Sequence, residues 1–250
     1  TYHHLTLSNS GAKSAGGTIT LLGNWVRSDA ATFTPGTNTV TLNALAGTSA
    51  QSISAVGGET FSSLTINSGF ATSPQVILNN PVTVSSVLTM TAGNVNLSGN
   101  TFTLSSTAGG ALDHTSGWMY GGSISRSFPN ATVNISTDAG LLPIGTSAYF
   151  RPFFFGKNSP AGNDSGTITL THSDPGTTAT GLNITDTSGP IILRNNSAWT
   201  STLNGGGSAT FGIRYGGTGM GTVTDVTHLH SMLLNSVIAT HVSGSGSTTD

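Results

Sequence analysis

Short bursts of alternating side chains fill residues 60–104, and this alternation constrains the fold more than any other feature of the chain. The bursts are Leu64–Ile66, Val76–Leu78, Val82–Val84, Val87–Met90, Val95–Leu97 and Phe102–Leu104. Apolar residues alternate with Ser, Thr or Asn, which is the period-two pattern of a strand with one buried face. Clusters of Asn, Gly and Pro between the bursts mark turns. No stretch shows equally strong helical periodicity, so we predict a ladder of short strands.

The composition supports an all-β protein. Charged residues make up only 6% of the 250 residues, against about 25% in an ordinary soluble domain. The chain has a single glutamate, Glu59, and two lysines, so the usual material of helix surfaces is scarce. Thr, Val, Ile and Phe are plentiful and favour strands. We therefore expect an exposed surface of neutral Ser, Thr and Asn side chains.

Charge and hydropathy argue against two classes of partner. The net charge is -2 and the basic residues are scattered, whereas nucleic-acid binding needs clustered Lys and Arg. No apolar run approaches the roughly 20 residues that span a bilayer. There are no cysteines, which leaves the compartment open. The sequence begins at Thr1 without a signal peptide, and we expect it to be a mature or excised piece of a longer protein.

The first half indicates stacked repeats. Residues 1–11 and 60–70 share Thr, an aromatic, two small or polar residues, Leu, Thr and an aliphatic residue, at an offset of 59. Repeats of short strands bury their inward residues by stacking. We predict a parallel β-solenoid over residues 1–115. An antiparallel sandwich gives a similar pattern and remains the alternative.

The second half has a different character. Residues 113–120 bring in Trp118 and Tyr120, the strands lengthen, and aromatic residues gather at 149–155. We predict a β-sandwich or jelly-roll-like domain over residues 116–242. Residues 243–250 form a Gly/Ser/Thr-rich stretch that we expect to be a flexible tail.

The sequence resembles the large secreted surface proteins of the Bacteroidota, which carry β-strand repeats and leave the cell by type IX secretion. The matching text lies at 23–44, 50–68, 78–104, 124–128, 141–153, 172–176 and 224–241. The resemblance implies an adhesin-like protein at the cell surface. Members usually end in a C-terminal sorting domain, which this sequence lacks, so we expect a processed or upstream fragment.

Histidines offer one candidate metal site. His3 and His4 are adjacent, so in a strand they face opposite ways. His228 and His230 would share a face, and Asp225 or His241 could complete a zinc site. A β face that simply carries two imidazoles is the favoured interpretation, and we predict no metal site.

Acidic residues give little sign of catalysis. The aspartates at 113, 138, 164, 174, 186 and 225 are isolated in sequence and suit turns, where Asp bonds its own backbone; a calcium site built from loops stays open. In the first half only Asp29 and Glu59 could act as paired carboxylates. We predict a non-enzyme with no catalytic residue and no cofactor.

Aromatic side chains could stack on sugars, although packing in the core or at the domain junction is favoured. The candidates are Trp25, Trp118, Tyr120, Trp199 and Tyr215. The N-x-[ST] sequences at Asn130, Asn134, Asn163, Asn183 and Asn195 are expected by chance in so Thr-rich a chain.

We predict an extracellular structural or adhesive protein, either an adhesin stalk or a filament subunit, that self-associates into a fibre or surface layer. Open solenoid ends can pair with neighbours, and a neutral surface repels itself little. A carbohydrate-binding module that contacts glycans is the alternative, and a polysaccharide-active enzyme the third reading. Neither nucleic-acid binding nor a membrane span is expected.

Overall fold

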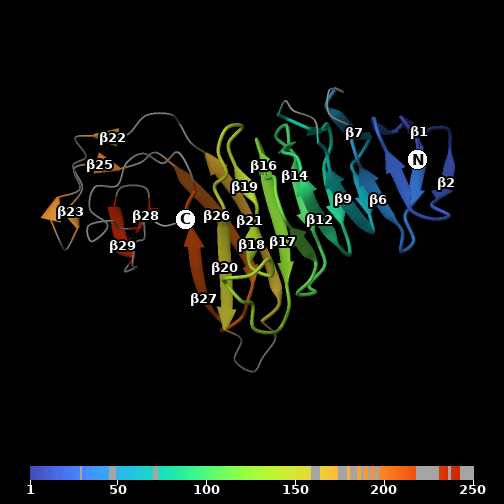
Figure 1. Ribbon diagram of the computed structural model, residues 1–250. Coiled ribbons are helices and arrows are strands. Elements are labelled where there is room, and N and C mark those ends of the chain that lie inside the picture. Colours follow the sequence, from blue (N-terminus) through green and yellow to red (C-terminus); the bar gives the residue numbers. More distant parts are fainter. Residues whose placement is uncertain are drawn as a thin grey trace.

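The computed structural model describes the chain except residues 29, 45–48, 70–72, 159–163, 174–178, 181–184, 187–188, 191–192, 195–196, 218–230, 236–237 and 243–250, and except the side chains of 179–194 and 231–242. Every regular element in the described residues is a strand, as the composition predicted. The strands stack along one long axis, with the N-terminus at one end (Figure 1).

Three sheets of parallel strands form the sides of a β-solenoid. The seven-stranded sheet contains β1 (Leu5–Leu7), β4 (Trp25–Arg27), β7 (Gln51–Ala55), β10 (Val76–Leu78), β13 (Val95–Asn96), β16 (Met119–Tyr120) and β19 (Ile144–Gly145). The five-stranded sheet contains β3 (Ile19–Leu21), β6 (Thr39–Leu42), β9 (Ser63–Asn67), β12 (Leu88–Ala92) and β15 (Leu112–His114). The third side begins with the pair β2 (Gly11–Ser14) and β5 (Ala31–Thr34) and continues in β8 (Glu59–Phe61), β11 (Val82–Val84), β14 (Thr101–Leu104) and β17 (Ser123–Phe128).

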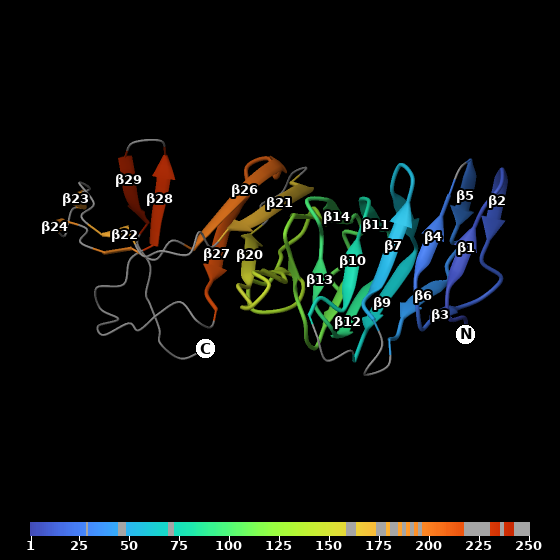
Figure 2. The ribbon, with the colours of Figure 1, turned by 90° about the horizontal axis from the view of Figure 1, so that it is seen from above.

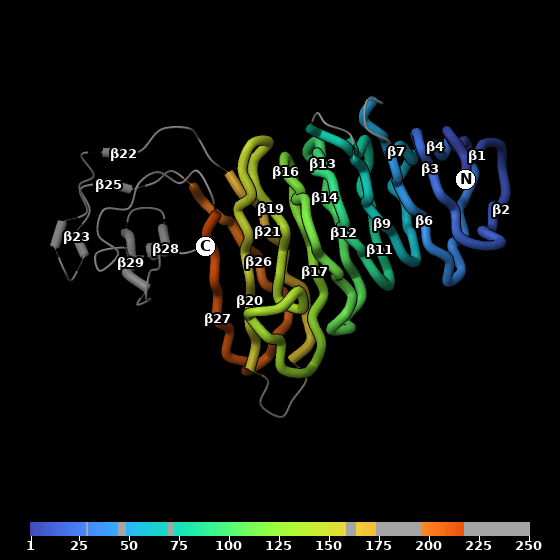
Figure 3. Tube along the Cα trace, in the orientation of Figure 1, coloured from blue at the N-terminus to red at the C-terminus, as the bar shows by residue number. Residues whose placement is uncertain are grey.

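The chain visits the three sides in turn, so each coil contributes one strand to each side (Figures 2 and 3). Seven strands in one sheet correspond to about six turns between residues 5 and 145. The predicted parallel solenoid is confirmed, and the sandwich alternative for the first half is wrong. The paired residues Leu5–Trp25, Trp25–Ile53 and Val76–Val95 show that coil length varies.

The predicted repeat at an offset of 59 does not match the coils. Leu5 lies in β1 of the seven-stranded sheet, whereas Leu64 lies in β9 of the five-stranded sheet. The two segments look alike because every side of the coil uses the same alternation of an aliphatic residue with Thr. Which side a strand occupies depends on the lengths of the intervening turns.

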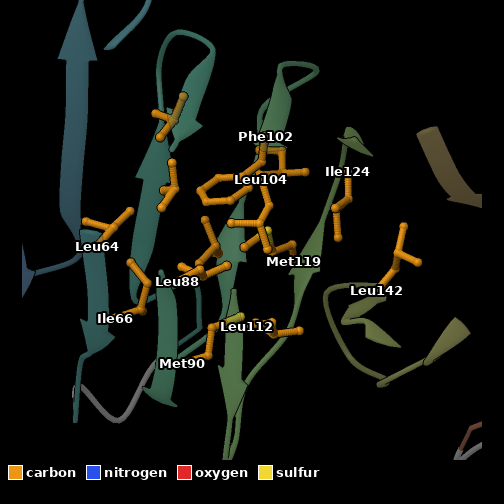
Figure 4. Close-up of a cluster of buried hydrophobic side chains, with 14 of the residues drawn as sticks. Leu64, Ile66, Leu88, Met90, Phe102, Leu104, Leu112, Met119, Ile124 and Leu142 are labelled. Carbon is orange, nitrogen blue, oxygen red and sulfur yellow. The ribbon is translucent and has the colours of Figure 1, made fainter. Parts of the chain in front are cut away.

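Inward side chains stack into a continuous core. Leu21, Leu42, Ile66 and Met90 follow one another along the five-stranded side, and each is at most 1% exposed. Figure 4 shows part of this stack, where side chains from the three sides meet. Burying one such side chain contributes roughly 1.5–3 kcal/mol. The core therefore depends on neighbouring coils, because no coil can bury these residues by itself.

Antiparallel strands follow the solenoid. β17 pairs in parallel with β14 on one edge and antiparallel with β21 (Gly166–Ser173) on the other, and β21 pairs with β26 (Ala198–Gly205). A second sheet contains β18 (Leu141–Leu142), β20 (Phe153–Asn158) and β27 (Thr210–Tyr215). Parallel pairing thus runs past residue 115, through β16 to β19. The remaining pairs are β22 (Ala179–Thr180) with β25 (Leu193–Arg194), β23 (Thr185–Asp186) with β24 (Gly189–Pro190), and β28 (Ser231–Asn235) with β29 (Ile238–Val242).

The two larger antiparallel sheets pack face to face on aromatic residues. The ring of Phe128 in β17 lies 5.7 Å from Phe155 in β20 and 5.7 Å from Phe211 in β27. Trp199 in β26 lies 4.6 Å from Tyr215 in β27. The sandwich-like arrangement predicted for the second half is therefore present, and it closes the C-terminal end of the solenoid core.

Candidate functional site

The first coil leaves one end of the solenoid open. β1, β2 and β3 each end their sheet, so their outer edges carry no further strand among the described residues. Only the outer edge of β3 is partly covered: the Tyr2 N–H donates to Thr20 O (2.8 Å) and the Leu22 N–H donates to Tyr2 O (2.9 Å). Unpaired strand edges are ready sites for pairing with another chain.

Several apolar side chains at this end are only half covered. Leu5, Leu7 and Ile19 of the first coil and Phe33 of β5 pack against the core but remain half-buried. One coil further in, Trp25, in register with Leu5, is 0% exposed. A hollow of about 330 Å³ opens among them, lined by Tyr2, Leu5, Leu7, residues 13–19 and Phe33. The end of the solenoid therefore presents core-like surface to its surroundings.

Lys13 is the one charged residue among those that line the hollow. It is in register with Phe33, which places it on the core-facing side of β2, and its Nζ donates to Ser10 O (3.2 Å). An inward charge on an edge strand hinders uncontrolled pairing with other sheets. Lys13 thus places a positive charge on the core-facing side of the open end.

Glu59, a residue of the only candidate catalytic pair, lies in a structural cluster. Its Oε2 accepts hydrogen bonds from Trp25 Nε1 (2.9 Å) and from Arg27 Nε (3.0 Å), and its Oε1 accepts one from the Thr60 N–H (3.1 Å). The carboxylate is 5% exposed. Asp29 lies outside the described residues, so the structure does not bring the two carboxylates together. The cluster stabilises the corner between β4 and β8.

Arg27 completes this cluster by binding three carbonyl groups. Its Nη1 donates to Ala31 O (2.7 Å), and its Nη2 donates to Val56 O (3.1 Å) and to Gly58 O. One guanidinium therefore ties together the turns on either side of the corner. The Arg27–Glu59 ion pair was not predicted, although an isolated Glu in so uncharged a chain could have suggested a buried partner.

The candidate aromatic residues divide between core and surface. Trp25 is buried, and Trp199 packs on Tyr215 at the sandwich interface while its Nε1 donates to Arg151 O (3.1 Å). Trp118 is half-buried and stacks on Phe150 with an interplanar angle of 26°. Phe150 also stacks with His114, with an interplanar angle of 24°. Packing therefore accounts for three of the candidates, and Tyr120 and Trp118 remain near the surface.

The second half holds buried cations that sequence reasoning missed. Arg126 donates through Nη1 to Asp138 O (2.6 Å) and to Leu141 O, and burial lowers its pKa to about 10, opposed in part by Asp138. Lys157 donates through Nζ to Asp164 O (3.1 Å) and lies 5.7 Å from the Phe128 ring centre. The available signal was a charged residue two positions from a phenylalanine in an otherwise uncharged strand: Phe128 for Arg126 and Phe155 for Lys157. These groups bind loop carbonyls, so they stabilise the sandwich.

The candidate metal ligands largely fall outside the described residues. This holds for Asp225, His228 and His230, and for the side chain of His241. Asp174, Asn163, Asn183 and Asn195 also lie outside the described residues, as does the side chain of Asp186. Within the described residues no three His, Asp or Glu side chains gather as a metal site would require. Asp164 is 1% exposed, and its Oδ1 accepts a hydrogen bond from the Ser208 N–H (3.2 Å), 44 residues along the chain, so this bond is a tertiary contact rather than the local turn bond that was predicted.

Comparison with known proteins gives no relative: the sequence matches no protein family and no curated protein, and no solved structure is similar to it. In the part of the chain that the structure describes, no helix has the length and hydropathy needed to cross a membrane.

Proposed function

We propose that this chain is a non-enzymatic extracellular structural or adhesive protein, an adhesin stalk or filament subunit, that self-associates through its open first coil. The observation that carries the proposal is the uncovered hollow at β1, β2 and β3, where core side chains lie half-buried beside free strand edges. The extracellular location rests on the resemblance of the sequence to Bacteroidota surface proteins.

The arrangement of edges favours growth along the solenoid axis. β26 and β27 end their sheets at the far end of the stack from β1 (Figure 1). Edges at both ends of an elongated molecule permit heterologous, head-to-tail contacts, which extend into fibres when they do not close. Two open first coils facing each other would instead form a closed dimer.

Analytical ultracentrifugation over a concentration series tests the proposal. Leu7→Arg places a charge in the hollow and should weaken association, because burying an unpaired charge is costly. Lys13→Leu removes the charge from the core-facing side of β2 and should strengthen association. Val56→Arg is the matched control, since Val56 is 66% exposed on a turn away from the hollow.

A wild-type protein that stays monomeric at all concentrations, with no fibres in electron micrographs, contradicts self-association. If the protein forms a dimer and no larger species, the open coil remains the proposed contact, and the proposal of a filament is contradicted. If Val56→Arg weakens association as strongly as Leu7→Arg, the contact lies elsewhere.

Carbohydrate binding is the second candidate, favoured by the ring cluster of Trp118 and Phe150 at the surface. Tyr149, which is 44% exposed, precedes Phe150 in the chain, and the Arg151 guanidinium lies over its ring. Aromatic faces of this kind bind the apolar sides of sugars. A glycan array with wild-type protein and Trp118→Ala separates this function from self-association, because Trp118 lies far along the stack from the first coil.

A further inference from the structure

The outer face of the six-stranded sheet carries hydroxyl groups in register. Thr83 pairs with Thr60 on one side and with Thr103 on the other. Beyond Thr103, the row continues through Ser125 to Thr169 and Thr202. One hydroxyl side chain from each of the six strands therefore lies in a single row across the sheet.

A second row runs beside the first on four of these strands. It contains Thr101, Ser123, Thr171 and Thr200, each two residues from a member of the first row. On three of the four strands the residues between the two rows, Phe102, Ile124 and Leu170, are buried, so the hydroxyl side chains there face outward. On β26, Thr202 and Thr200 lie on the same face through their pairing with Thr169 and Thr171. The exposed or half-buried state of the row residues agrees with this. The result is a two-dimensional array.

The array has two regular spacings set by the backbone. Neighbouring strands lie about 4.8 Å apart, and residues i and i+2 of one strand lie roughly 6.6 Å apart. A prism face of hexagonal ice also presents water oxygens on a rectangular lattice, with two repeats in the same size range as those of the array. Water molecules bound between the hydroxyl groups would thus lie near lattice positions.

The side chains of the array suit an ordered neutral lattice. Neither row contains a charged or aromatic residue. The two rows are therefore complementary to an uncharged surface and contain no strongly hydrated charged side chain. Thr is stiff about χ1, and the Thr169 Oγ1–H donates to Ser125 Oγ (3.1 Å). Preorganised groups lose little entropy on binding.

We propose that the outer face of the six-stranded sheet, defined by the two rows from Thr60 to Thr202, binds ice. Crystalline polysaccharide is the competing ligand with hydroxyl groups on a lattice. Protein sites for sugars rely on aromatic faces, and the surface aromatics Trp118 and Tyr149 stand outside both rows. The observations therefore favour water over sugar at this face. The proposal is independent of self-association.

Thermal hysteresis and partition of the protein into a growing ice front test the proposal at a concentration where the protein is monomeric. The variant Thr103→Tyr/Thr169→Tyr inserts bulky rings into the central row and should lose most of both activities. Thr41→Tyr/Thr65→Tyr is the matched control, because these residues belong to the row Thr20, Thr41, Thr65 and Thr89 on the five-stranded sheet, which has no second row of hydroxyl side chains of that length beside it. The control should keep wild-type activity, and thermal melting should show that both variants are folded.

Wild-type protein that neither shifts the freezing point nor enters the ice overturns the proposal. So does equal loss in the control, which would place the activity on another face. Binding of the wild-type protein to cellulose or chitin particles, lost in Thr103→Tyr/Thr169→Tyr without any ice activity, would assign the face to polysaccharide and contradict ice binding.

Discussion

At the residue scale, the Arg27–Glu59 ion pair (3.0 Å) is nearly buried, with side chains 11% and 3% exposed. Removing only one partner of such a pair is costly, because the charge of the other partner stays buried. Its position at a corner between coils explains why a chain with one glutamate keeps that glutamate inside. The sequence marked Glu59 as unusual, but its partner Arg27 is 32 residues away and only the coil geometry joins them.

We expect Glu59→Leu to lower the free energy of unfolding by about 3 kcal/mol, since it leaves the Arg27 guanidinium without its carboxylate. Urea denaturation measures the change. A double-mutant cycle with Arg27→Met isolates the pair, and the double variant should be less destabilised than the two single changes predict together. A midpoint for Glu59→Leu equal to that of wild type contradicts the role assigned to the pair.

At the element scale, side-chain amides connect one coil to the next. Gln51 at the start of β7 is 0% exposed; its Oε1 accepts a hydrogen bond from the Ala44 N–H (2.9 Å), and its Nε2 donates to Leu21 O (3.0 Å) and Gly23 O (2.7 Å). The Asn67 Nδ2 donates to Asn43 Oδ1 (3.0 Å) in the same way between neighbouring turns. These bonds satisfy turn groups that the parallel ladders leave open.

Gln51→Met keeps similar volume but removes all three bonds. The Ala44 N–H and the Gly23 carbonyl lose this partner, whereas the Leu21 carbonyl keeps its bond from the Asn43 N–H (2.8 Å). We expect a loss of about 3 kcal/mol in unfolding free energy, because each unsatisfied buried group costs roughly 1–3 kcal/mol. Ser52→Met serves as the control, since Ser52 is the half-buried outward neighbour on β7. Equal melting temperatures for the two variants would show that the amide bonds carry no net stability.

At the scale of the whole molecule, the two ends of the solenoid differ. The C-terminal end is closed by the antiparallel sheets, where Leu142, Phe153 and Phe155 are buried. The N-terminal end has only half-buried residues over its core. In a solenoid each coil is stabilised chiefly by its neighbours, so a coil with one neighbour opens more readily than a coil with two.

We therefore expect amide hydrogens of β1, β2 and β3 to exchange faster than those of β9, β11 and β12 in monomeric protein. Hydrogen exchange followed by mass spectrometry measures this gradient along the axis. Association through the open coil should raise protection of β1–β3 selectively. Uniform protection along the monomer would mean that the first coil is as stable as the interior, which contradicts the open-end account.

How much of this structure the sequence alone predicts depends on whether each sequence pattern reflects local contacts or contacts between distant residues. Alternation such as Val82–Thr83–Val84 is local, so it identified the strands, the all-β class and the stacked coils. The likeness of residues 1–11 to 60–70 misled for the same reason, since a local pattern carries no information about which side of the coil a strand occupies.

Tertiary structure alone decided the features on which the proposals rest. Leu5 and Trp25 occupy equivalent positions, yet one is half-buried and the other fully buried, because among the described residues only Trp25 is covered by a coil on both sides. Thr83, Thr103 and Ser125 are ordinary strand residues in the sequence, and they become a row only when turn lengths set the register between coils. The sequence determined which side chains face outward; the stacking of coils, a sum of contacts between residues far apart in the chain, determined which of them stand side by side.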